Sequence, residues 1–117
     1  MGMICFMSVT RTRGVCCELD VRLDPKSAEE TADLLKALAD PTRLSMLATL
    51  RDAADPVCIC DFTAAYELSQ PTISHHMAKL REAGLVEAEK EGIWVYYRLS
   101  DPLPERAAAL LESLLGR

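Results

Sequence analysis

Four of the five cysteines in this sequence lie in two close pairs, an arrangement suited to binding a soft ion. Cys58 and Cys60 are separated by one residue and precede Asp61, whereas Cys16 and Cys17 are adjacent. Residues i and i+2 of a regular helix point ~200° apart, so Cys58 and Cys60 can share one ion only just before a helix or in its loosened first turn. Asp61 would then be the N-cap, and the helix dipole would lower the pKa of the thiols.

The number of thiolates decides which ion such a site prefers. Two thiolates rarely complete a site, so Cys16 and Cys17 are the obvious further donors. Three thiolates suit As(III) or Sb(III), which bind as a pyramid with a lone pair, and four suit Cd(II), Pb(II) or Zn(II) in a tetrahedron. A competing interpretation is that Cys58 and Cys60 are small buried core residues, as free cysteine often is. For Cys5 we expect no role.

A predicted helix over residues 69–84 could place hydrogen-bonding side chains in the major groove of DNA. Polar residues can cap its start, a proline lies in its first turn and Gly84 can end it. Ile73, Met77 and Leu80 are spaced as a buried stripe, and the opposite face is polar. Such side chains can contact base edges or phosphates. The candidate DNA-binding residues of this segment are Ser69, Gln70, Thr72, Ser74, His75, His76 and Lys79.

Four further helices are expected around this one. The first begins at Ser27, which we expect to be its N-cap, and the second begins at Pro41, with Asp40 capping it. A short helical segment lies within residues 57–67, and a last helix covers about residues 103–115. Two short helices joined by a tight turn, the second with a polar outer face, are typical of a helix-turn-helix.

After Gly84 the hydrophobic period changes to that of strands. Residues 85–90 and 93–99 are predicted to form a β-hairpin around a Glu91–Gly92 turn, which makes the fold a winged helix-turn-helix, mainly α with a β-hairpin wing. Lys90 and Arg98 could contact the DNA backbone or the minor groove, although neighbouring glutamates weaken such a phosphate clamp.

Composition and charge limit the function classes. A chain of 117 residues fits one domain, which we divide into a flexible arm over residues 1–26 and a folded domain over residues 27–117. The net charge of −5 excludes binding of nucleic acid by charge alone. We expect a cytoplasmic protein without a signal peptide or membrane span, in which cysteines bind metal or react with oxidants. We do not expect an enzyme, since C-x-x-C and phosphate-loop motifs are absent from the sequence.

Four sequence blocks, Leu38 to Leu44, Cys58 to Asp61, Ser69 to His76 and Trp94 to Arg98, closely resemble the ArsR/SmtB family of metal-sensing repressors. The resemblance runs in order from about residue 28 to residue 100. It implies a homodimeric winged helix whose first and last helices form the dimer interface. It also implies a repressor of palindromic operators in double-stranded DNA, released when an ion binds.

The resemblance further implies which residues sense the ion. Cys58 and Cys60 of one chain would share it with Cys16 or Cys17 of the partner subunit. Arsenic-responsive members often have a third cysteine where this chain has Thr63, so the third donor must lie elsewhere. We rank As(III) or Sb(III) first and Cd(II) or Pb(II) second. A thiol redox-sensing repressor and a plain interaction module remain alternatives.

Overall fold

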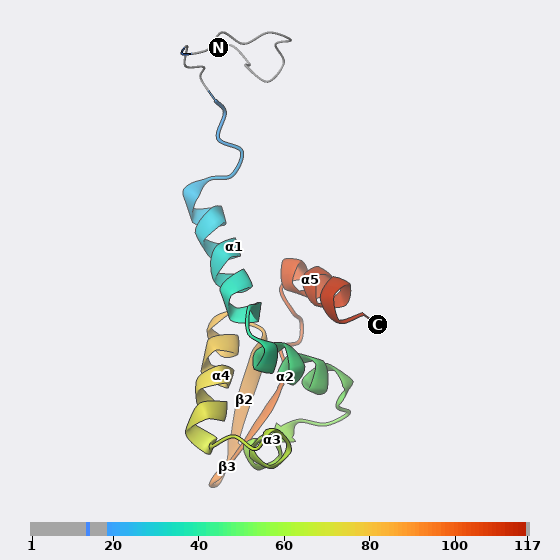
Figure 1. Cartoon of the computed structure of the whole chain (residues 1–117). Coiled ribbons are helices and arrows are strands. Elements are labelled where there is room, and N and C mark those ends of the chain that lie inside the picture. Colours follow the sequence, from blue (N-terminus) through green and yellow to red (C-terminus); the bar gives the residue numbers. More distant parts are fainter. Residues whose placement is uncertain (1–13, 15–18, 117) are drawn as a thin grey trace. The chain divides into compact units, whose positions relative to one another are not determined.

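Helices make up most of the chain that this computed structural model describes, which comprises residue 14 and residues 19–116. The chain separates into two units, residues 1–30 and residues 31–117. In the described ranges, none of the helices combines the length and the apolar character that a membrane span requires. In chain order the elements are α1 (Pro25–Leu38), α2 (Pro41–Asp52), β1 (Val57–Cys58), α3 (Ile59–Tyr66), α4 (Gln70–Glu82), β2 (Val86–Glu91), β3 (Trp94–Leu99) and α5 (Glu105–Leu115) (Figure 1).

Helix α1 begins earlier than the sequence pattern indicates. The Asp24 carboxylate accepts hydrogen bonds from the backbone N–H of Ser27 at 2.9 Å and from its hydroxyl at 2.9 Å. The prediction of Ser27 as the N-cap was therefore wrong. Pro25 occupies the first helical position, for which its fixed φ and missing N–H are suited, and Asp24 before it supplies the capping oxygens.

The core of the second unit lies between α2, α3, α4 and the base of the wing. Asp40 caps α2 as predicted, since its carboxylate accepts the backbone N–H of Arg43 at 3.0 Å. The largest fully buried side chains are Phe62, Met46, Leu47, Ile73, Met77, Leu80 and Leu85. This core fixes α4 against α2, α3 and the wing.

The wing belongs to a three-stranded antiparallel sheet with the strand order β1–β3–β2. Strand β1 was not predicted, because its two residues are too short to show a period. It pairs with the middle strand β3, placing Cys58 opposite Tyr96. The hairpin turn is Gly92–Ile93 rather than the predicted Glu91–Gly92, because Gly92 supplies the positive φ of 63° at the first turn position.

Candidate nucleic-acid interface and thiol pair

The ends of helix α4 are defined by its own sequence. The Ser69 hydroxyl accepts the backbone N–H of Thr72 at 3.4 Å, and the proline predicted for the first turn lies there. At the other end, Gly84 adopts a φ of 77° and donates its N–H to the Arg81 carbonyl at 2.9 Å. The Leu85 N–H returns to the Leu80 carbonyl at 3.0 Å. This pairing satisfies the last carbonyls of the helix and turns the chain into the wing.

The two faces of α4 separate as the hydrophobic spacing predicts. Ile73, Met77 and Leu80 are fully buried. Exposed polar side chains follow the helix from its N-terminus to its last turn, namely Ser69, Gln70, Thr72, His75 and Lys79. Lys79 lies 3.9 Å from Glu82, and both side chains reach solvent. Ser74 is half-buried, and its hydroxyl faces that of Tyr97 in the wing.

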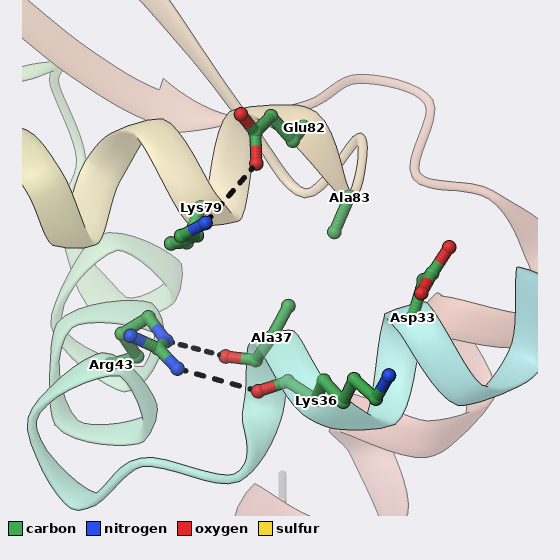
Figure 2. A pocket seen from close by; sticks show the side chains of 7 residues that line it. All are labelled: Asp33, Lys36, Ala37, Arg43, Lys79, Glu82 and Ala83. Carbon is green, nitrogen blue, oxygen red and sulfur yellow. Dashed lines mark hydrogen bonds and ion pairs between the residues drawn. The ribbon is translucent and has the colours of Figure 1, made fainter.

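His76 departs from the expected outward orientation. Its side chain is only 15% exposed, and its Nδ1 lies 3.2 Å from Nη1 of Arg43 and 3.9 Å from the Asp40 carboxylate. Arg43 also donates to the Ala37 carbonyl at 2.7 Å and to the Lys36 carbonyl at 3.3 Å (Figure 2). Helical geometry explains the difference, since at ~100° per residue His76 lies ~65° from the centre of the buried stripe and His75 lies ~165° away.

A recess of about 420 Å³ opens beside this arginine, between α1, α2 and the end of α4 (Figure 2). Three cationic and two anionic side chains line it, and the thiol pair does not contribute to it. Its lining residues are Asp33, Lys36, Ala37, Arg43, Lys79, Glu82 and Ala83.

The wing presents mixed chemistry. Lys90 is exposed, whereas Arg98 is paired with Glu87 at 3.0 Å. At the tip, Ile93 is 84% exposed and Trp94 is about half exposed. Arg98 must therefore leave a carboxylate before it can bind a phosphate, which limits its contribution.

Cys58 and Cys60 meet where β1 ends and α3 begins. Cys58 is the last residue of β1 and the N-cap of α3, with extended backbone angles, and the Sγ atoms lie 3.0 Å apart. Cys58 is buried and Cys60 is exposed, and both are free thiols. The thiols converge as predicted for the start of a helix, with Cys58 at the N-cap and Cys60 in the first turn, but Asp61 also lies in the first turn and is not the N-cap.

The electrostatics of the pair differ from the expectation of lowered thiol pKa values. The hydrogen bond from Cys60 to Cys58, followed by burial and the charges of Cys58 and Asp61, raises the pKa of Cys60. Tyr96 lies opposite Cys58 in the β1–β3 pair. Burial and then the charges of Cys58 and Glu91 raise the pKa of its hydroxyl. For Cys60 the hydrogen bond and burial, ahead of the neighbouring charges, therefore act against the expected lowering.

A complete thiolate site does not form within the described part of the chain. There, no group of three or more histidine, cysteine, aspartate or glutamate side chains could hold a metal ion. The further donors predicted, Cys16 and Cys17, lie outside the described residues, as does Cys5.

Comparison with known proteins identifies the class. A model described as "Bacterial regulatory protein, arsR family" matches residues 40–88. The arsenical resistance operon repressor of Escherichia coli (strain K12) is 46% identical over 79 residues, which cover 68% of this chain and 67% of that protein. The chain belongs to the ArsR family. As an ArsR-family chain it is a DNA-binding transcriptional regulator with a winged helix-turn-helix, and not an enzyme.

Two further relatives of this ArsR-family chain support the assignment. The arsenic resistance transcriptional regulator ArsR1 of Pseudomonas putida is 43% identical over 82 residues, which cover 70% of this chain and 63% of that protein. The homodimeric winged helix-turn-helix DNA-binding domain Mb0332 from Mycobacterium bovis shares the fold with a TM-score of 0.64 and 30% identity, over 83% of this chain and 87% of that one.

Sequence reasoning missed two residues of this region. Arg43 lies in the first of the four sequence blocks, three residues after the capping Asp40, and an arginine at this position can reach back to the end of the preceding helix. Tyr96 carried no signal, because its proximity to Cys58 depends on the unpredicted strand β1.

Proposed function

We propose that this ArsR-family chain is a homodimeric repressor that binds a palindromic operator and releases it when As(III) or Sb(III) binds its cysteine thiolates. One observation carries the proposal: the Cys58 and Cys60 thiols lie 3.0 Å apart at the start of α3, the helix that directly precedes the reading helix. The names of the two relatives, both tied to arsenic resistance, support the choice of effector.

Helix α4 would read the operator. Its exposed polar face fits a major groove, and Ser69, Gln70, Thr72 and His75 can reach base edges or phosphates near its N-terminus. Lys79 and the exposed wing residue Lys90 would bind flanking phosphates, with Arg98 contributing once it leaves Glu87. We leave His76 out of this face because it is packed on Arg43.

A dimer would supply a second recognition helix. Two-fold symmetry places two recognition helices one helical turn of DNA apart, which matches a palindrome. Leu35 of α1 is 49% exposed and Leu114 of α5 is 56% exposed, and both are apolar side chains that a dimer interface would cover. The homodimeric domain from Mycobacterium bovis supports this assembly.

The thiol pair fits a shared ion. Two thiolates that bind one ion at ~2.3 Å lie at most ~4.6 Å apart, and the observed 3.0 Å separation satisfies this limit. A third thiolate is needed for As(III), and we assign it to Cys16 or Cys17 of the partner subunit. Binding at Cys58 would act on α3, whose buried Phe62 belongs to the same core as α4. A coupling of ~1–3 kcal/mol would weaken DNA binding ~5–150-fold, and DNA would weaken ion binding equally.

The experiment is DNA release from the reduced full-length protein, measured by fluorescence anisotropy on a labelled duplex from upstream of its own gene at fixed salt. Arsenite, antimonite, cadmium, lead and zinc are titrated separately. We expect arsenite to act at the lowest concentration, with the response lost in Cys58→Ser and Cys60→Ser and unchanged in the matched control Cys5→Ser. An arsenite response that survives both substitutions would refute the site.

Proton release separates the two effector classes. Arsenite replaces each As–O bond with an As–S bond and loses each hydroxide as water with the thiol proton, so no net protons reach the buffer. Cd(II) and Pb(II) displace thiol protons into the buffer. Calorimetry in buffers of different ionisation enthalpy therefore distinguishes them. Release by cadmium or lead alone would identify the alternative effector, and release by peroxide in the presence of a chelator would identify the redox-sensing alternative.

A further inference from the structure

A single guanidinium group joins three segments of the second unit. Arg43 donates from Nε to the Ala37 carbonyl at 2.7 Å and from Nη2 to the Lys36 carbonyl at 3.3 Å, both in the last turn of α1. Its Nη1 lies 3.2 Å from Nδ1 of His76 in α4. The last carbonyls of a helix have no partner within that helix, so Arg43 ends α1 and contacts the reading helix at once.

The contact fixes the protonation state of the histidine. Arginine remains charged and has only donors, so Nδ1 of His76 must be the acceptor. His76 is therefore neutral, with its proton on Nε2. A proton on Nδ1 would point at a cation and remove the hydrogen bond.

The charged surroundings of His76 define what a second proton does. Arg43 and the Asp40 carboxylate, at 3.2 Å and 3.9 Å from Nδ1, face it from the start of α2. Helix α1 presents the Lys36 and Ala37 carbonyls to Arg43 rather than to the imidazole. On α4 itself the neighbour is His75, whose ring centroid is 6.3 Å away. Protonation would exchange the Arg43 partner for Asp40 and release α4 from the end of α1.

We propose that Arg43 is a positioning residue for DNA reading, which holds α4 through neutral His76, so that protonation of His76 weakens DNA binding. The inference does not depend on the identity of the effector. Protonation of the two adjacent histidines should have opposite effects on DNA affinity. A proton on exposed His75 adds positive charge to the DNA-facing side and strengthens binding, whereas a proton on His76 loosens the helix.

The test is the pH dependence of DNA affinity between pH 5.5 and 7.5, on the upstream duplex and at fixed salt, with the reduced full chain. The ordinary pKa of histidine, ~6.5, lies within this range and those of carboxyl and thiol groups lie outside it, so variants at the two histidines of the chain are compared. His75→Gln isolates His76, and His76→Gln isolates His75. The glutamine oxygen at position 76 still accepts from Arg43 and takes up no proton.

We expect the affinity of His75→Gln to fall about threefold to tenfold from pH 7.5 to 5.5, the range for loss of one hydrogen bond. The affinity of His76→Gln should rise or stay constant. Arg43→Lys keeps the charge but cannot maintain the three-way fork, so its DNA affinity at pH 7.5 should be lower and its pH dependence should resemble that of His76→Gln. Identical pH profiles for the wild type and His76→Gln would overturn the proposal.

A second measurement needs no DNA and no variant other than His75→Gln, which serves to assign the spectrum. Nitrogen-15 NMR of the wild-type imidazoles, assigned with His75→Gln, reports which ring nitrogen carries the proton. We expect one histidine, His76, to be the Nε2–H tautomer at pH 7.5, with Nδ1 unprotonated. A proton on Nδ1 of His76 at that pH would refute the proposal even if His76→Gln and Arg43→Lys failed to fold.

Discussion

Removal of the Asp40 carboxylate should destabilise the start of α2 by a measurable amount. Its Oδ2 accepts the backbone N–H of Arg43 at 3.0 Å, and the side chain is only 29% exposed. Pro41 has no N–H, so this hydrogen bond satisfies one of the few free donors in the first turn. Loss of such a cap costs ~1 kcal/mol, within a range of about 0.5–2 kcal/mol. For a domain of this size Asp40→Ala should lower Tm by about 4–8 °C per kcal/mol.

The effect should depend on pH in a defined direction. The hydrogen bond from the Arg43 backbone, together with the charge of Arg43 and against the opposing effect of burial, lowers the pKa of Asp40 below its ordinary value. A carboxylate whose pKa is lower in the folded state stabilises the protein at pH values above its unfolded pKa of ~3.9. This stability is lost as the pH falls through the folded pKa. The difference between the wild type and Asp40→Ala should therefore shrink as the pH falls below ~4.

The assay is thermal unfolding by circular dichroism at one protein concentration, because the stability of a dimer depends on concentration. Asp40→Asn is the matched control, since its amide oxygen still caps the helix without the charge. We expect Asn at this position to retain most of the wild-type Tm. If Asp40→Ala unfolds at the wild-type temperature, or if its deficit persists unchanged at pH 3, then the cap does not stabilise α2 in this way.

Three further predictions concern packing, backbone and thiols. Met77 is fully buried, so Met77→Ala should lower the free energy of unfolding in urea by ~2–5 kcal/mol, and Met77→Leu should lower it by less than ~1.5 kcal/mol. Equal losses in the two variants would contradict tight packing around this side chain. Glu67 has a φ of 54° in the turn before α4, so Glu67→Gly should raise the free energy of unfolding by up to ~1 kcal/mol. Gly84 has a φ of 77°, so Gly84→Ala should lower it by a similar amount. Changes of the same sign in both variants would exclude a backbone cause. With the other three cysteines changed to serine, iodoacetamide should alkylate exposed Cys60 faster than buried Cys58, and mass spectrometry would reveal the reverse order.

Local signals were sufficient for the reading helix. Its cap at Ser69, its terminating Gly84 and its buried stripe act within one helix, and each is found where the sequence places it. The same holds for Asp40 at the start of α2. Capping and helical spacing depend on residues a few positions apart, so a sequence contains all the information they need.

Features that depend on tertiary contact were not predictable in this way. Strand β1 exists only because it pairs with β3, and this pairing brings Tyr96 beside Cys58. His76 has a helical position at the border of the polar face, and the packing of Arg43 over it decides its orientation. The raised pKa of Cys60 likewise follows from the Sγ–Sγ distance of 3.0 Å, which spacing along the chain does not determine.

The start of α3 has a consequence for what a bound ion would do. Cys58 occupies the N-cap, but its side chain accepts no backbone N–H of the first turn, at a position where serine or aspartate would add ~1 kcal/mol. Helix α3 therefore begins without a side-chain cap. An ion held by both thiolates would tie the end of the strand to the first helical turn and act as an inorganic cap. The ligand would then complete an element of secondary structure as well as fill a site, and its binding would be detected as added order in the eight residues of α3.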